Sequence, residues 1–208
     1  MNFLAHIYLS GESEQVLVGN FIGDAIKGRN YESFPNLVQK GITLHRFIDS
    51  FTDTHPYVQR SKFMLNSHYH KYSGVIVDIF YDHFLTRSWK FFSDIPLREF
   101  IYHTYEVLIR NSGLFPSEVK KYFPFFVLNN WLETYTCISG IESVLKRMAI
   151  RTSLPDFTSF AIETMLKEYS SFEKQFLEFF PELIDAVQEN YNITLPNYKV
   201  PKKYLPRA

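Results

Sequence analysis

The chain has 208 residues, and the 46% that are hydrophobic provide enough apolar material for one sizeable buried core. Its 22 basic and 22 acidic side chains balance, which argues against a general electrostatic attraction to nucleic acid or to a membrane surface. The single cysteine, Cys137, excludes an internal disulfide framework, and eight glycines are few for an all-β sandwich. No apolar run approaches the roughly 18 residues of a membrane span, and the N-terminus lacks a signal-peptide pattern. We therefore expect a cytoplasmic protein without a membrane or nucleic-acid partner.

Apolar side chains recur at helical spacing along most of the chain, and no alternating strand pattern competes with them. Ser13 is the expected N-cap of an early helix, and Pro56 is expected to stop or bend the second helix. A third helix is expected to follow Ser73 and Gly74. The apolar residues that mark these three helices are, in order, Val16, Ile22 and Ile26; Leu37, Leu44, Ile48 and Phe51; and Ile76, Ile79, Phe80 and Phe84.

In the second half, the letters PSE at residues 116–118 are typical of a helix start, and that helix is expected to lead towards Trp131 and Tyr135. Residues 158–190 are expected to form one long amphipathic helix with a kink at Pro181.

These patterns predict an all-α fold with a single helical domain over residues 1–192. Residues 193–208 differ in composition, because they contain three prolines, four basic side chains and no acid. We interpret this segment as a basic C-terminal tail.

The strongest polar pattern is TLHRFIDSFTDTH at residues 43–55, where His45, Asp49 and Asp53 are spaced four residues apart. On a helix the three side chains lie along one face. Carboxylates one turn apart repel each other, so an isolated helix gains nothing from this arrangement unless a bound cation or an arginine compensates.

A second pattern, GVIVDIFYDHF at residues 74–84, places Asp78 and Asp82 one turn apart in apolar surroundings, with His83 beside Asp82. Burying an unpaired carboxylate costs several kcal/mol, so Asp78 is expected to be paired, protonated or bound to metal. A third pair, Asn20 and Asp24, repeats the four-residue spacing.

Any one of these pairs is more often a hydrogen-bonded core group than a ligand set. Their coincidence on three helices, together with His45 and His83, favours a metal site. Imidazole and carboxylate ligands together suit Mn, Fe, Zn or Mg, and the lack of thiolates disfavours a structural zinc site. With open positions, such a site would activate water against a phosphorus or carbonyl centre.

Four segments in order resemble the acyl carrier protein phosphodiesterase family: MNFLAHIYLS from residue 1, GNFIGDAIKG from residue 19, GITLHRFIDSFTDTHP from residue 41 and DIFYDHFLTRSW from residue 78. The resemblance implies an all-helical fold similar to the HD-domain metal-dependent phosphohydrolases, with an atypical ligand arrangement. It also implies hydrolysis of the phosphodiester that joins 4′-phosphopantetheine to a serine of holo-acyl carrier protein, giving the apo protein. The implied cofactor is a divalent metal, with Mn²⁺ expected and Mg²⁺ as the alternative.

On this chain the family's polar positions fall on His6, Asn20, Asp24, His45, Asp49, Asp53, Asp78, Asp82 and His83. The residues expected to bind the metal or orient water are Asp24, His45, Asp78, Asp82 and His83. Those expected to take part in catalysis are Asp24, His45, Asp49 and Asp78, with Asp49 either holding the ring of His45 or acting as general base.

Supporting roles behind these groups are expected for His6, Asn20 and Asp53, and Asp53 is expected to cap a helix or to pair with Arg46 or Arg60. His55 is a weaker candidate, because its position varies in the family.

Acyl carrier proteins are acidic, so a neutral enzyme needs a local basic patch to attract one. Lys27 and Arg29 are the candidate contacts, because they follow Asp24 directly. Further basic groups that could serve are Arg60 with Lys62, Lys120 with Lys121, and Lys146 with Arg147 and Arg151. Trp131 and Tyr135 either line a groove for the pantetheine arm or fill the core, whereas Trp89 is expected in the core.

Two other functions fit the same residues. The same fold could hydrolyse a nucleotide or another small phosphate ester, because a fold does not fix its substrate. Alternatively, the polar helices could form a paired core network in a binding module without catalysis.

Overall fold

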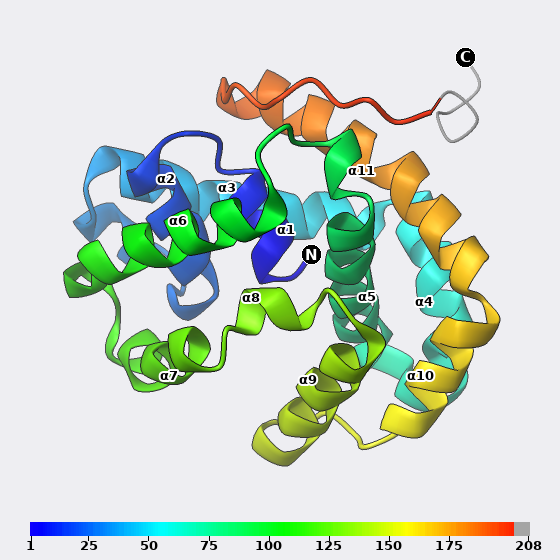
Figure 1. Cartoon of the computed structure of the whole chain (residues 1–208). Helices are drawn as coiled ribbons and strands as arrows, with labels where there is room; N and C mark the ends of the chain where they lie inside the picture. Colours follow the sequence, from blue (N-terminus) through cyan, green and yellow to red (C-terminus); the bar gives the residue numbers. More distant parts are fainter. Residues whose placement is uncertain (202–208) are drawn as a thin grey trace.

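The computed structural model describes residues 1–201, in which eleven α-helices follow one another and no strand is present. The predicted all-α fold is confirmed. The helices, joined by loops and short 3-10 turns, are α1 (Phe3–Tyr8), α2 (Glu14–Ile22), α3 (Asn36–Thr54), α4 (Pro56–Tyr69), α5 (Ser73–Arg87), α6 (Leu97–Arg110), α7 (Ser117–Leu128), α8 (Trp131–Thr134), α9 (Ile138–Arg151), α10 (Thr158–Lys167) and α11 (Tyr169–Tyr191) (Figure 1). Within this part of the chain, no helix combines the length and the apolar character needed to cross a membrane.

Several helix ends lie where the sequence places them. The Ser13 hydroxyl accepts a hydrogen bond from the Val16 N–H and caps α2. Helix α3 ends at Thr54, and Pro56 opens α4, where its fixed φ suits the first turn and its missing N–H costs nothing. Helix α5 begins at Ser73 itself, two residues earlier than a helix that follows Ser73 and Gly74.

The early helix is shorter than predicted. Helix α2 ends at Ile22, and residues Gly23–Ala25 form a separate 3-10 turn, so the expectation that one helix reaches Ile26 is wrong. This turn packs closely on α3, since a Cβ on Gly23 would lie 2.4 Å from the ring of His45. Asn20 and Asp24 therefore do not share one regular α-helix.

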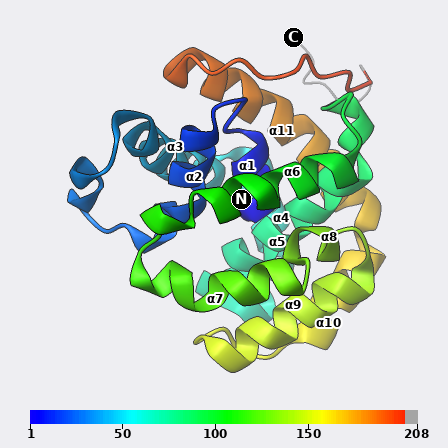
Figure 2. The same ribbon diagram turned by 60° about the vertical axis from the view of Figure 1, so that its left-hand side comes forward.

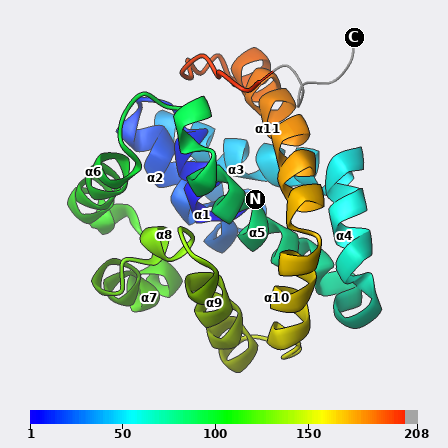
Figure 3. The same cartoon turned by 45° about the vertical axis from the view of Figure 1, so that its right-hand side comes forward.

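The predicted long C-terminal helix is two helices. The break is at Glu168, whose carbonyl accepts hydrogen bonds from the N–H groups of Ser171 and Phe172 and so starts α11 anew. The expected kink at Pro181 is not the break, since α11 continues through that residue to Tyr191. The change of direction lets α10 pack on α9 while α11 packs on α3, α4 and α5 (Figure 3).

The helix that begins at Ser117 is also shorter than predicted. It ends at Leu128, and Asn130 adopts a left-handed conformation with φ 45° before the short helix α8 carries Trp131. This turn separates α7 from α8 and gives each its own direction (Figure 2).

Helix α1 lies in the middle of the molecule, in contact with α2 on one side and α5 on the other (Figures 1 and 2). Helix α2 in turn packs along α3, and α6 contacts both α2 and α8. Helices α1, α2, α3 and α5 thus meet around α1, although they are spread over residues 3–87 of the sequence.

Phenylalanine rings fill the contact between α5 and α11. Phe80, Phe84, Phe172, Phe176 and Phe180 are all fully buried. Phe80 meets Phe172 edge to face, and Phe176 stacks on both Phe84 and Phe180. Burying one such side chain stabilises the fold by about 1.5–3 kcal/mol, so this layer holds α5 firmly in place. Trp89 is also buried, as predicted.

After α11, residues 192–201 form neither helix nor strand, and Ile193, Leu195 and Val200 are buried. Lys199 donates to Asp94 across the surface. The basic residues Lys202, Lys203 and Arg207 of the expected tail lie outside the described residues, and the division at residue 192 stays a prediction.

Helices α2 and α3 approach so closely that their backbones touch. A Cβ on Gly41 would lie 2.2 Å from the Val16 carbonyl oxygen and 2.7 Å from the Asn20 nitrogen, and a Cβ on Gly19 would lie 2.1 Å from the Val38 carbonyl oxygen. Neither of these glycines can be replaced unless the two helices separate.

We therefore expect Gly41→Ala to lower the free energy of unfolding by about 1–3 kcal/mol, because the added methyl overpacks against backbone atoms that cannot move aside. Denaturant unfolding followed by circular dichroism would measure the loss. Gly113→Ala is the matched control, since a Cβ there meets nothing within 4 Å. Equal stability of the two variants would contradict the close approach of α2 and α3.

Candidate metal centre

Polar side chains from five neighbouring elements converge beside the start of α1. They are His6 on α1, Asn20 on α2, Asp24 on the 3-10 turn after α2, His45 and Asp49 on α3, and Asp78 on α5. His45 and Asp49 face the same way because they are one turn apart on α3. The remaining members come from segments that only the tertiary fold brings together.

The ring of His6 is fixed by Asn20. The side-chain amide of Asn20 donates to the His6 carbonyl at 2.7 Å and to the Ser10 hydroxyl at 3.0 Å, so its oxygen faces His6 Nδ1 at 2.9 Å. Nδ1 must therefore carry the proton. Nε2 is left as an acceptor, and it lies 3.1 Å from an Asp49 oxygen and 3.1 Å from the Met1 carbonyl oxygen.

His45 has the same arrangement. Its Nδ1 donates to the main-chain carbonyl of Asn20 at 2.8 Å, and its Nε2 lies 3.2 Å from Asp24 and 3.2 Å from Asp49. Neither carboxylate contact has hydrogen-bond geometry, so Nε2 is buried without a hydrogen-bond partner among residues 1–201. The rings of His6 and His45 stack with their centroids 4.1 Å apart.

When both rings are neutral, both Nε2 atoms present lone pairs towards carboxylate oxygens, which also carry lone pairs. Only a proton or a bound cation between them makes such contacts favourable. Burial alone would lower the pKa of His45, but Asp24 and Asp49 outweigh it and raise that pKa to about 9. The pKa of His6 is lowered, because burial and the neighbouring His45 both oppose a second positive charge.

The carboxylates of the cluster differ in their affinity for protons. Burial would raise the pKa of Asp49, yet its contacts with His45 and His6 hold it well below the usual range. Burial raises the pKa of Asp78, although the N-terminal ammonium 3.0 Å away opposes the shift. That ammonium also lies 3.8 Å from Asp49, so a positive charge stands between the two acids.

The donor set fits a divalent cation. Ligand atoms of His6, His45 and Asp49 all lie within 4.8 Å of one another, and no ion is needed to hold either ring in its orientation. A hollow of about 20 Å³, lined by His6, Asn20, Asp24 and His45 among others, has room for one ion or one water. Mixed nitrogen and oxygen ligands of this kind are typical of first-row metal sites.

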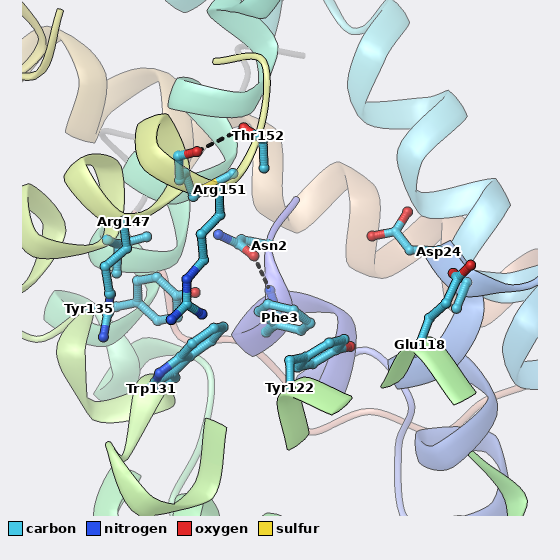
Figure 4. A pocket seen from close by; sticks show the side chains of 13 residues that line it. Asn2, Phe3, Asp24, Glu118, Tyr122, Trp131, Tyr135, Arg147, Arg151 and Thr152 are labelled. Carbon is cyan, nitrogen blue, oxygen red and sulfur yellow. Dashed lines mark hydrogen bonds between the residues drawn. The ribbon is translucent and has the colours of Figure 1, made fainter. Parts of the chain in front are cut away.

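Two larger hollows open beside the cluster. The first, here called the acidic cleft, has a volume of about 710 Å³ and contains Asp24, Asp49 and Asp78 with Lys62 and Lys71. The second, here called the aromatic pocket, has a volume of about 460 Å³ (Figure 4). Asn2, Asp24 and Met148 line both, so the two hollows adjoin beside the polar cluster.

The family model for acyl carrier protein phosphodiesterase matches residues 1–183. The chain belongs to this family. It is similar to the acyl carrier protein phosphodiesterase of Photorhabdus laumondii, with 29% identity over 94% of this chain and 100% of that one. It is also similar to the proteins of that name from Escherichia coli O157:H7, with 33% identity over 88% and 96% of the two chains, and from Yersinia enterocolitica, with 28% identity over 91% and 98%.

No solved structure is significantly similar to this chain. The expected likeness to the HD-domain phosphohydrolases therefore stays a prediction, while the relation to the phosphodiesterase family rests on nearly the whole sequence.

Of the nine polar positions that the family resemblance singles out, the structure brings six together, namely His6, Asn20, Asp24, His45, Asp49 and Asp78. His6 has a larger part than the sequence indicates, because its Nε2 faces Asp49, and the Nε2 of His45 faces the same carboxylate. No sequence pattern indicates the Met1 carbonyl or Lys71, because both reach the site only through the tertiary fold.

Asp82 and His83 are not brought to the cluster. The Asp82 carboxylate is fully buried and accepts hydrogen bonds from the N–H groups of Leu4 and Ala5, so it caps the first turn of α1. Burial raises its pKa to about 7, against the pull of those two donors. His83 faces the other way, with Nδ1 at 2.7 Å from the Tyr135 carbonyl and Nε2 at 3.0 Å from the Tyr169 hydroxyl.

Asp53 lines the acidic cleft but stands apart from the histidines. It pairs with Lys62 at 3.2 Å and not with Arg46 or Arg60. Arg46 instead donates to the carbonyls of Ile26 and Gly28.

His55 lies away from the cluster, where it caps α4 and contacts Glu182 at 3.0 Å. Lys27 donates to the Asp24 carbonyl at 2.7 Å, and Arg29 lies 3.9 Å from Glu32, so both basic side chains are on the surface near the Asp24 turn.

We expect Asp82→Ala to lower the free energy of unfolding by about 1–3 kcal/mol, because it leaves two buried N–H groups of α1 without an acceptor. Thermal or denaturant unfolding would measure the change, with Asp94→Ala as control, since Asp94 is exposed and its ion-pair partner within residues 1–201 is Lys199. A stable Asp82→Ala protein that has lost all activity would instead place Asp82 in the chemistry.

In the chelator-treated protein, we expect stability to fall as the pH rises from about 6.5 to about 9. The folded-state pKa of His45, about 9, lies above the ordinary value for histidine. Its stabilising charge is therefore fully present below pH 6.5 and is lost as the pH rises through 9. Melting temperatures of the wild type and of His45→Gln across this range would separate the His45 contribution, and parallel curves would contradict it. Added Mn²⁺ should restore stability at pH 9 in the wild type only, because the cation replaces the proton.

Proposed function

We propose that this chain hydrolyses the phosphodiester between 4′-phosphopantetheine and a serine of holo-acyl carrier protein, releasing the apo carrier protein. The observation that carries the proposal is the pair of histidine Nε2 atoms that share Asp49 at the edge of an open cleft. The family match and the names of the relatives support the substrate. They give no support to a nucleotide or other small phosphate ester as the substrate.

The cation would be held by His6, His45 and Asp49, with Asp24 and Asp78 at its margins. When bound, a divalent cation neutralises the phosphoryl oxygens and lowers the pKa of water. We propose Mn²⁺ as the cation, with Mg²⁺ as the alternative. Mg²⁺ prefers oxygen ligands, so a ligand set with two imidazoles suits it less well.

The chain's own side chains divide the remaining work. Asp49 contacts both imidazole rings, which supports a role in holding them and leaves it a weak base. Asp78 is the better proton acceptor, because it lines the cleft and its pKa is raised. Lys62 and Lys71 also line the acidic cleft and are placed to attract the anionic phosphodiester.

The acidic carrier protein would dock beside the cleft. Lys27 and Arg29 lie on the exposed turn that follows Asp24, and they stay our candidate contacts for that partner. A cytoplasmic location completes the proposal, in keeping with the single free cysteine.

The test is the intact mass of holo-acyl carrier protein after incubation with the enzyme and Mn²⁺, with a chelator-treated sample as control. We expect metal-dependent conversion to the apo mass. Asp24→Ala should slow the conversion by at least about 100-fold, because it removes one carboxylate from the cluster. The side chain of Asp24 is 85% exposed, so helical circular dichroism should be unchanged.

The matched control for this variant is Asp94→Ala, which removes a carboxylate far from the cluster and should convert the carrier protein at the wild-type rate. Wild-type activity of Asp24→Ala would show that the cluster is not the active site. No conversion by the folded wild type with either Mn²⁺ or Mg²⁺ would refute the proposed substrate.

A further inference from the structure

The aromatic pocket has the volume of a small-molecule site and walls that come from several helices. Its walls are built from the start of α1, from α7, α8 and α9, and from the turn that carries Asp24 (Figure 4). Its volume of about 460 Å³ lies within the range of about 300–1,000 Å³ that is usual for small-molecule sites. None of the proposed chemistry uses it, apart from Asp24 at its margin.

The aromatic wall of the pocket is already in place. Tyr122 and Trp131 lie nearly parallel, with an interplanar angle of 7° and centroids 6.3 Å apart. Phe126 meets Trp131 and Phe3 edge to face from behind, at 5.5 Å and 5.1 Å. A ligand that enters this pocket therefore finds rings whose positions are fixed by the core, which reduces the entropy lost on binding.

The opposite wall is one face of α9. Val144, Arg147, Met148 and Arg151 all line the pocket, and their spacing of three, four and seven residues puts them on the same side of the helix. The Arg147 guanidinium lies over the Trp131 ring, 5.1 Å from its centroid. Within residues 1–201, neither arginine forms an ion pair with a carboxylate, so both can donate hydrogen bonds to a ligand. The one acid of the pocket besides Asp24 is Glu118, which lies near Asp24 and away from the arginines in Figure 4.

We propose that the aromatic pocket binds the pantetheine arm of the substrate, with the phosphate at the Asp24 end and the arm pointing towards Trp131 and Arg147. This inference rests on the proposed function. The scissile phosphate stands at one end of a linear arm, so the arm must leave the cluster through a hollow that is continuous with it. The aromatic pocket meets this requirement, because it shares Asn2, Asp24 and Met148 with the acidic cleft.

The chemistry of the arm matches the walls. Its dimethyl group and methylenes suit the aromatic rings, and its amide carbonyls and hydroxyl are acceptors for guanidinium N–H groups. The carrier protein's serine would then lie on the side of the acidic cleft, where Lys62 and Lys71 are placed. Recognition of the arm in this way distinguishes the holo carrier protein from the apo form that the reaction leaves behind.

The test is calorimetric titration of the full-length protein with 4′-phosphopantetheine, which needs no turnover. The variant Val144→Trp fills the pocket and should weaken binding by at least about tenfold. Ile150→Trp is the matched control, because Ile150 lies on the same helix but is 84% exposed and lines neither hollow. It should bind as the wild type does.

A second variant guards against misfolding, since Val144 is buried. Arg151→Met removes one donor from an exposed position and should weaken binding severalfold, whereas Lys146→Met on the same helix should not. Wild-type affinity in both Val144→Trp and Arg151→Met would overturn the inference. So would tighter binding of adenosine monophosphate than of 4′-phosphopantetheine to the wild type.

The same proteins, assayed on holo-acyl carrier protein, separate this inference from the proposed function. If the wild type binds 4′-phosphopantetheine in the pocket but leaves the holo carrier protein intact, the proposed hydrolysis is wrong and the pocket assignment stands. If the wild type releases the apo carrier protein and Val144→Trp does so with an unchanged KM, the hydrolysis stands and the pocket assignment is wrong.

Discussion

The candidate metal centre depends on one buried residue, Asn20. Its side-chain oxygen receives the Nδ1 proton of His6, and its main-chain carbonyl receives the Nδ1 proton of His45. Both imidazoles are thereby fixed in the tautomer that turns Nε2 towards Asp49. With neutral rings the nitrogen and carboxylate lone pairs would meet unfavourably, which favours a proton or a cation between them. The arrangement persists because the surrounding packing does not allow the rings to turn.

That constraint extends into the backbone. Asn20 can reach both histidines only because α2 and α3 are in contact at Gly19 and Gly41. Gly23 in turn leaves the space that the ring of His45 occupies. The close approach of α2 and α3 thus requires glycine at positions 19 and 41. The positions of the polar atoms around Asn20 depend on this short distance between the two helices.

The sequence predicts a large part of this arrangement. Helical spacing alone places His45 and Asp49 on one face of α3, and apolar surroundings mark Asp78 as a carboxylate that needs a partner. Spacing does not show which way a helix faces. Asp78 and Asp82 are one turn apart on α5, yet Asp78 borders the cleft while Asp82 caps α1, because α1 lies across that turn. The same limit applies to His83, whose partners Tyr135 and Tyr169 come from distant segments. The break at Glu168 escapes the apolar pattern, because the periodicity continues across it.

The packing of α11 has a consequence for the order of events during synthesis. Helix α3 carries His45 and Asp49 on one face, and its other face is covered by α11, where Tyr191 donates to the Thr43 carbonyl and Phe179 packs on Phe51. These contacts join residues more than a hundred positions apart in the sequence. When a nascent chain has emerged from the ribosome up to the end of α5, it contains every residue of the candidate metal centre. The apolar face of α3 that α11 will cover is still exposed at that stage. The residues of the centre are therefore synthesised early, and we expect the centre to become ordered only after α11 has been synthesised and has packed on α3.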